Sequence, residues 1–162
     1  MEAAIARMVH DIALDLMDSN PVFLPVMNGG LVIGGKLLTR LNIPLEVSYV
    51  HATRYRNTTS GQGLEWKVKP QIDFTGRPVV IVDDILDEGH TLCEIVDYCK
   101  AEGASDVYTV VLTDKKHDRK ARPGLKADYA ALELEDRYVF GYGMDYKGYW
   151  RNAPGIFAVK NL

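Results

Sequence analysis

The chain has 162 residues, 47% of them hydrophobic, which fits one folded domain over residues 1–162 and excludes a chain too polar to build a core. The formal net charge of −3 argues against nucleic acid as a partner, because proteins that bind it concentrate Lys and Arg on one surface. No apolar run approaches the roughly 18 residues of a membrane span, so we expect no membrane partner either.

The first third of the sequence predicts helices and strands in alternation. Apolar side chains at helical spacing mark the helices, and short apolar runs mark the strands. In chain order, the pattern predicts a helix over 2–18, a strand over 22–26, a weaker helix over 31–41 and a strand over 45–53. The glycine-containing turn Asn28-Gly29-Gly30 separates the first strand from the second helix.

The middle of the sequence predicts a loop, half of a hairpin and then a buried strand followed by a helix. Residues 54–64 are polar and lack periodicity, which is typical of a flexible loop. Alternation over 65–69 predicts the returning arm of a hairpin. The β-branched run over 79–82 predicts a central parallel strand. Residues 91–102 have helical spacing, and Gly103 stands where a C-terminal cap belongs.

The last third predicts further strands around a polar segment. In chain order, these are a strand over 107–112, polar residues over 113–128 and short strands over 129–134 and 139–143. The basic stretch 115–122 is typical of a solvated loop. Strand–helix–strand alternation along the whole chain predicts an α/β fold, a single domain with a central, mostly parallel twisted sheet flanked by helices.

The segment Val79–Leu92, with the sequence VVIVDDILDEGHTL, carries the chemistry. A buried strand is predicted to end in Asp83 and Asp84, and Asp87 follows before a turn enters a helix. Ligands of parallel α/β proteins bind beyond the carboxyl ends of the strands, so we expect both carboxylates at the edge of a site. Adjacent carboxylates are tolerable when they face hydroxyl donors or a hard cation such as Mg²⁺.

The turn that precedes the predicted helix has the properties of a phosphate site. Its unpaired N–H groups and the helix dipole favour an anion, Gly89 lets the backbone approach closely, and Thr91 adds a hydroxyl. Asp87 and Glu88 would have to point away from that phosphate. A purely structural interpretation, in which the acidic residues only cap and charge a helix start, fits a generic junction of this kind as well.

The whole segment resembles the phosphoribosyl-pyrophosphate (PRPP) motif of type I phosphoribosyltransferases: an apolar strand, two acidic residues, two apolar residues, Asp and a short Thr/Gly-rich turn. The resemblance extends from about Leu24 to the end of the chain and points to the hypoxanthine-guanine phosphoribosyltransferases. It implies their fold, in which a small hood region and a flexible loop accompany the sheet. The other segments similar to family motifs are Met27–Gly30, residues 54–64, Leu112–Lys115, Tyr138–Tyr146 and Arg151.

The resemblance implies a purine salvage reaction, in which 5-phosphoribosyl passes from PRPP to N9 of hypoxanthine or guanine and gives IMP or GMP plus pyrophosphate. The residues it assigns to PRPP and its phosphates are Asp83, Asp84, Asp87, Glu88, Gly89, His90, Thr91, Asn28, Gly29 and Arg151. The residues it assigns to the purine are Lys115, Tyr138, Val139 and Asp145. Asp87 is expected to act as the catalytic base, Tyr55 to help close the loop, and Asp83, Asp84 and Asp145 to bind Mg²⁺.

The expected partners are therefore small molecules, PRPP and a 6-oxopurine base. Lys115 would donate to the exocyclic O6, which excludes adenine but does not rank hypoxanthine, guanine and xanthine. The family also implies a homodimer or homotetramer. Cys93 and Cys99, six residues apart, match no zinc or disulfide pattern, so we expect reduced thiols and a cytoplasmic protein.

Three rival interpretations remain open. A relative without enzymatic activity could bind nucleic acid or sense the ribose ligand, although the acidic balance of the chain argues against a basic binding face. A phospho-acceptor signalling domain also pairs carboxylates with a lysine, but its acidic pair follows the first strand. Transfer to a different base is the third, and the segment from Lys115 to Asp145 is more similar to purine enzymes than to pyrimidine ones.

Overall fold

The computed structural model describes residues 1–54 and 64–160. Tyr55 and most of the predicted loop over 54–64 lie outside the described residues. The elements in chain order are α1 (Glu2–Leu16), β1 (Val22–Pro25), α2 (Gly30–Leu38), β2 (Glu46–Val47), β3 (His51–Arg54), β4 (Leu64–Val68), β5 (Val79–Leu86), α3 (His90–Ala101), β6 (Val107–Lys116), β7 (Tyr129–Glu135), β8 (Val139–Phe140) and β9 (Phe157–Ala158).

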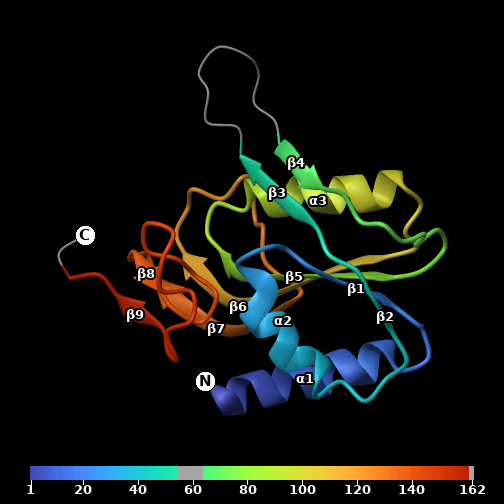
Figure 1. Cartoon of the computed structure of the whole chain (residues 1–162), viewed down its shortest axis with the longest axis horizontal. Coiled ribbons are helices and arrows are strands. Elements are labelled where there is room, and N and C mark those ends of the chain that lie inside the picture. Colours follow the sequence, from blue (N-terminus) through green and yellow to red (C-terminus); the bar gives the residue numbers. More distant parts are fainter. Residues whose placement is uncertain (55–63, 161–162) are drawn as a thin grey trace.

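Five parallel strands form the centre of the protein, in the order β2-β1-β5-β6-β7 (Figure 1). β5 lies in the middle, with Val79 opposite Val22 of β1 and Val107 of β6. The run Val79–Val82 is buried throughout, as expected for a parallel strand that is covered on both faces. The predicted central parallel strand is therefore confirmed.

Helices cover both faces of the sheet (Figure 1). On one face lie α1 and α2, whose side chains Ile5, Ile12, Ile33 and Leu37 are almost fully buried against the sheet. On the other face, Ile95 of α3 belongs to a second core cluster, which also includes side chains of the β3–β4 hairpin. The helical spacing of apolar residues explains this burial, because it gathers them on one side of each helix. The predicted α/β class, a mostly parallel sheet flanked by helices, is confirmed.

Helix α3 ends as the sequence predicts. Gly103 follows the helix with φ +93°, a backbone conformation that glycine adopts without strain. The N–H groups of Gly103 and Ala104 donate to the carbonyls of Lys100 and Cys99, which closes the end of the helix. Among the described residues, no helix is both long enough and apolar enough to cross a bilayer.

The predicted strand over 45–53 is wrong, because this segment forms two strands that belong to different sheets. β2 pairs with β1 in the main sheet, whereas β3 pairs antiparallel with β4, which confirms the predicted hairpin arm. Between them, Val50 makes only an isolated bridge to Val26. The split arises from pairing with two partners that lie far apart in sequence, and periodicity along one segment does not reveal such partners.

β5 and β6 both continue past their predicted ends into polar sequence. Asp83 pairs with Val111 of β6, and Lys115 of β6 pairs with Leu134 of β7. Ladder hydrogen bonds from the neighbouring strands hold these residues in extended conformation even though the apolar run has stopped. Asp83 and Asp84 therefore lie inside a strand rather than after it, and so does Lys115.

Residues 138–160, which we call the hood, form the small two-stranded sheet of β8 and β9 with tight turns between the strands (Figure 1). The predicted strand over 139–143 ends at Phe140, because Gly141 and Gly143 have positive φ and turn the chain. The hood reaches the sheet near the ends of β1 and β5, where Gly143 lies against the carbonyl oxygen of Gly29. β9 is too short for a sequence pattern to reveal it.

Candidate active site

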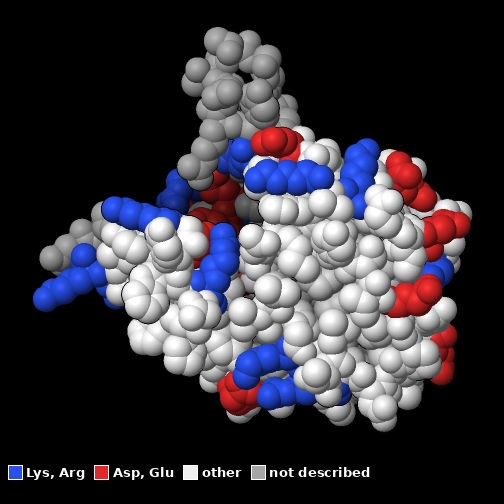
Figure 2. All heavy atoms as spheres, in the orientation of Figure 1, with Lys and Arg blue, Asp and Glu red and all other residues white. Residues whose placement is uncertain are grey.

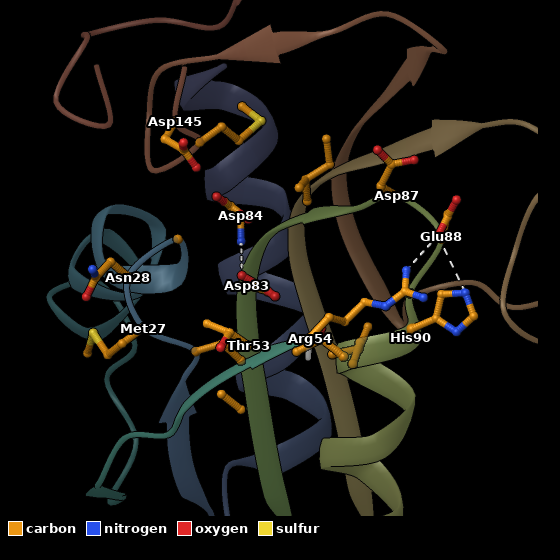
Figure 3. A pocket seen from close by; sticks show the side chains of 18 of the residues that line it. Met27, Asn28, Thr53, Arg54, Asp83, Asp84, Asp87, Glu88, His90 and Asp145 are labelled. Atoms are coloured by element: carbon orange, nitrogen blue, oxygen red, sulfur yellow. Dashed lines mark hydrogen bonds and ion pairs between the residues drawn. The ribbon is translucent and has the colours of Figure 1, made fainter. Parts of the chain in front are cut away.

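A cavity of about 520 Å³ lies between the hood and the carboxyl ends of β1, β5 and β6 (Figure 3). Figure 2 shows acidic side chains at the bottom of this hollow and Lys and Arg side chains around it. Of the residues that the sequence assigned to a site, Tyr55 lies outside the described residues. All the others line the cavity: Asn28, Gly29, Asp83, Asp84, Asp87, Glu88, Gly89, His90, Thr91, Lys115, Tyr138, Val139, Asp145 and Arg151.

Asp83 and Asp84 leave β5 on opposite faces of the sheet, because side chains alternate along a strand. Asp84 lies on the face of Val82, which packs under α2, and Asp83 lies on the face of Ile81, which packs under α3. The Asp83 Oδ1 atom accepts the backbone N–H of Asp84 at 2.9 Å (Figure 3). Both carboxylates nevertheless line the cavity, as expected, although the pleat of β5 directs them to opposite faces of the sheet.

Burial shifts the acidity of both carboxyl groups. It raises the pKa of Asp83 well above its usual range, and the neighbouring charge of Asp84 raises it further. Burial also raises the pKa of Asp84, against the opposing effects of Asp83 and of the Arg151 guanidinium, whose Nη1 atom lies 3.9 Å from Asp84 Oδ2. One guanidinium beside two carboxylates leaves an excess of negative charge, which favours a cation or hydroxyl donors at this position.

The turn before α3 leaves the start of that helix open to the cavity. Gly89 has φ +84°, a backbone conformation that favours glycine, and a Cβ atom there would press on the Leu125 and Leu86 side chains. Glu88 points sideways, 3.2 Å from Arg54 Nη1 and 3.5 Å from His90 Nε2 (Figure 3). Its charge is thus directed away from the first-turn N–H groups of α3, which have no partners within the helix.

Asp87 points away from the helix start as well, toward two side chains of β6 and the segment that follows it. Its Oδ2 atom accepts from Lys115 Nζ at 2.8 Å, and its Oδ1 atom lies 2.7 Å from His117 Nε2. Burial raises the pKa of the Asp87 carboxyl, but the hydrogen bonds from Lys115 and His117 outweigh burial and the net pKa is lowered. Asp87 is therefore an ionised acceptor at the wall of the cavity.

The segment after β6 makes hydrogen bonds to backbone carbonyls of the turn before α3. The Lys120 ammonium donates to the carbonyls of Leu86 and Asp87 at 3.0 and 2.9 Å and to Asp114 Oδ1 at 2.8 Å. The backbone N–H of Ala121 donates to the carbonyl of Glu88 at 2.7 Å. The prediction of a solvated loop over 115–122 is therefore wrong for His117 and Lys120, whose side chains are largely buried, and Lys115, which was assigned to the purine site, is buried as well.

His117, Lys120 and Arg54 were missed by sequence reasoning. Each contacts the 87–88 turn from a position about thirty residues away along the chain. For His117 and Lys120, the only sequence signal was the density of basic residues directly after a strand that ends at the same sheet edge as β5. That signal does not distinguish an exposed lysine from one that is buried against a carbonyl oxygen. Arg54 is the first residue of the predicted loop over 54–64, in which the sequence assigned a role to Tyr55 alone.

The hood closes the other side of the cavity. Arg151 Nη2 lies 2.8 Å from Asp145 Oδ1, and Arg151 Nη1 donates to the carbonyl of Gly143 at 2.7 Å, so this arginine holds the hood turn together. Tyr138 stands at the rim with 44% of its surface exposed, and the Tyr146 ring lies edge-on to it at 5.8 Å. An exposed ring at the rim of a polar cavity is available for stacking on a planar ligand.

The turn after β1 completes the wall. Gly30 N–H donates to the carbonyl of Val26 at 2.8 Å, which folds residues 27–30 into a tight turn at the start of α2. A Cβ atom at Gly29 would overlap the Asp84 carboxylate, so the backbone lies directly against that group. The Asn28 side chain lies on the cavity wall near the hood (Figure 3).

A parallel sheet with carboxylates at the ends of its strands, beside an open helix N-terminus, is characteristic of α/β proteins that bind phosphorylated ligands. A family model described as "Phosphoribosyl transferase domain" matches residues 1–147. The hypoxanthine-guanine phosphoribosyltransferase of Bacillus subtilis is 32% identical, over 98% of this chain and 90% of its own length. The chain belongs to the phosphoribosyltransferase family.

Other relatives agree with this assignment. The hypoxanthine-guanine phosphoribosyltransferase of Streptococcus pneumoniae is 28% identical, over 97% of this chain and 87% of its own length. A crystal structure of such an enzyme from Bacillus anthracis has the same fold, with a TM-score of 0.90 at 24% identity and coverage of 98% and 93% of the two chains. The predicted membership of the phosphoribosyltransferase family is thereby confirmed.

Proposed function

We propose that this enzyme transfers 5-phosphoribosyl from PRPP to N9 of hypoxanthine or guanine and so produces IMP or GMP plus pyrophosphate in purine salvage. One observation carries the choice of base: Lys115 and Asp87 meet at 2.8 Å on the cavity wall, a cationic donor and an ionised acceptor side by side. A 6-oxopurine presents the complementary pair, the O6 acceptor and the N7 proton. The printed names of the relatives point to the same substrates.

The phosphates of PRPP find donors on two sides of the cavity. The first-turn N–H groups of α3, from Gly89 to Thr91, hold the 5′-phosphate, because the helix start favours an anion and Glu88 is turned toward Arg54. Pyrophosphate lies against the turn at Asn28 and Gly29, within reach of Arg151. The planar guanidinium of Arg151 suits phosphate oxygens, and its partner Asp145 would be free to bind Mg²⁺ when Arg151 binds pyrophosphate.

Mg²⁺ fits the carboxylates of this site. Asp83, Asp84 and Asp145 supply only oxygen atoms, which Mg²⁺ prefers, and a bound cation would offset the burial that raises the pKa of Asp83 and Asp84. Asp83 and Asp84 would hold the ribose hydroxyls directly or through one Mg²⁺ ion, and Asp145 would hold a second ion. When bound, the ions supply electrostatic stabilisation of the negative charge on the departing pyrophosphate.

The purine base is held by groups on β6 and in the hood. Lys115 donates to O6, and the Tyr138 ring stacks on the purine plane beside Val139. Since Lys115 now binds Asp87 Oδ2, its move to O6 frees this carboxylate oxygen for the proton on N7. In the reaction, the C1–N9 bond forms, the bond from C1 to pyrophosphate breaks, and the N7 proton passes to Asp87.

The reaction takes place in the cytoplasm under this proposal. Cys93 and Cys99 are both buried free thiols, which supports a reducing compartment. Burial raises the pKa of the Cys99 thiol to about 12, so this cysteine stays protonated and unreactive toward oxidants.

Pyrophosphate release tests the proposed function. With Mg²⁺ and PRPP, we expect release with hypoxanthine or guanine, little or none with adenine, and loss of activity when EDTA removes the metal. Adenine carries an amino donor where the 6-oxopurines carry O6, so it leaves the Lys115 ammonium without an acceptor. No release with any base, despite binding of PRPP measured by calorimetry, would favour a regulatory protein that senses the ribose ligand.

Replacing Lys115 by Ala should lower kcat/KM for hypoxanthine by about 10- to 100-fold, the usual effect of losing a hydrogen bond from a charged donor. The ratio of kcat/KM for hypoxanthine to kcat/KM for adenine should fall at the same time. Lys116→Ala is the matched control, because Lys116 is exposed and pairs with Glu133 outside the cavity. Steady-state kinetics with both bases measure the effect, and equal losses in the two variants would rule out a role of Lys115 in base recognition.

A further inference from the structure

His117 is buried beside Asp87, and its ring is held at both nitrogen atoms. Its side chain is only 5% exposed, and Nε2 lies 2.7 Å from Asp87 Oδ1. The backbone N–H of Arg119 donates to Nδ1 at 3.1 Å. Because Nδ1 accepts this bond, it carries no proton in this arrangement, and the proton of the neutral ring is on Nε2, directed at Asp87. The surrounding chain therefore fixes the tautomer of His117.

A metal ion is a poorer explanation of this cluster. Ligand atoms of Asp87, His117 and Asp136 lie within 4.8 Å of one another, a spacing that could accept an ion. The Lys115 ammonium, however, lies 2.8 Å from Asp87 and 3.8 Å from Asp136, and Arg119 lies 2.7 Å from Asp136. Both carboxylates already have cationic partners, which would repel a metal ion. Hydrogen bonding to Asp87 accounts for the buried imidazole without one.

We propose that His117 is a positioning residue for the catalytic base Asp87, an inference that rests on the proposed function. The two oxygens of this carboxylate have separate partners, His117 at Oδ1 and Lys115 at Oδ2. When Lys115 turns to O6 of the base, His117 keeps Oδ1 in place, and Oδ2 is left facing N7. The Asp87 backbone is fixed independently, because Lys120 binds its carbonyl oxygen at 2.9 Å.

The hydrogen bond from His117 also keeps Asp87 ionised when Lys115 moves from Asp87 to O6 of the base. Burial raises the pKa of Asp87, and the bonds from Lys115 and His117 lower it. Once Lys115 is engaged by the base, the His117 bond opposes burial directly. The other charged groups nearby are Asp136, Arg119, Glu88 and Lys120, and the side chains of all four pair with side chains other than Asp87.

The test compares His117→Ala with His117→Gln, whose side-chain amide nitrogen can reach the position of Nε2. In His117→Ala we expect kcat to fall about tenfold, the KM for PRPP to stay unchanged, and the acid limb of the kcat/KM profile to move to higher pH. His117→Gln should recover most of kcat and the original acid limb. Asp118→Ala, an exposed neighbour, should behave like the wild type.

Two results would overturn the positioning role. One is an unchanged kcat and pH profile in His117→Ala; the other is a His117→Gln variant as slow as His117→Ala, which would indicate a loss of packing. ¹⁵N NMR of the protein without base gives a readout apart from activity: we expect a protonated Nε2 and an unprotonated Nδ1 for His117, and the opposite tautomer contradicts the inference. Failure of the wild type to release pyrophosphate would instead contradict the proposed function.

Discussion

Asp87→Asn should lower kcat by about 10²- to 10⁴-fold with hypoxanthine, the usual range for the loss of a general base. Asn has the shape of Asp and can still accept a hydrogen bond from Lys115, but its amide does not take up the N7 proton. Binding of PRPP should change little, because the backbone of the turn before α3 is held by Lys120 and by Ala121. Steady-state kinetics and calorimetry with PRPP separate the two effects.

Asp136→Asn is the matched control for this substitution. Asp136 lies 3.8 Å from the same Lys115 ammonium, so the control removes an equal charge at a similar position outside the cavity wall. We expect its kcat to remain within about twofold of the wild type, as for most surface substitutions. If the two variants lost activity equally, the effect would come from the charge around Lys115, and Asp87 would not be the base.

The pH dependence follows from the same contacts. In the proposed reaction Asp87 takes up a proton only when it is ionised, so we expect activity to be lost as the pH falls through its pKa. Hydrogen bonds from Lys115 and His117 outweigh burial and lower that pKa, which places the loss below the usual range of an aspartate. The base is therefore available throughout the neutral range.

Gly143→Ala should lower the free energy of unfolding by about 3–5 kcal/mol, a loss typical of severe backbone strain combined with overpacking. Gly143 has φ +111°, and a Cβ atom there would overlap the carbonyl oxygen of Gly29 and press against Asp84. Neither neighbour can move freely, because one is backbone and the other lies in the central strand β5. Urea unfolding followed by tryptophan fluorescence measures the loss.

Gly148→Ala, a second substitution in the hood, introduces backbone strain without steric overlap. Gly148 has φ +84°, but a Cβ atom there would meet open space, so only the backbone strain of about 1 kcal/mol is expected. Gly143→Ala should also weaken PRPP binding, since the displaced groups at Gly29 and Asp84 both line the cavity. Equal destabilisation in the two variants would show that the contact between the hood and the Gly29 turn contributes nothing.

Much of the fold could be predicted from local patterns. Helical spacing identified the first helix and α3, and the β-branched run identified the core of β5. The fourteen residues from Val79 to Leu92 contain the strand, the acidic residues and the helix start in one continuous segment. Its resemblance to the PRPP motif therefore located one wall of the cavity, because the residues of that wall are neighbours in the chain.

Only the tertiary structure determines the orientation and the contacts of the side chains that line the cavity. The division of residues 45–53 between two sheets, the continuation of β5 through Asp83 and Asp84, and the strand β9 all depend on distant pairing partners. The bonds of His117 and Lys120 to the Asp87 turn likewise join residues about thirty positions apart. A sequence pattern reports which face of its own element a residue occupies. Which groups meet across the cavity is set by the packing of separate elements, and this packing gives Asp87 its partners and its lowered pKa.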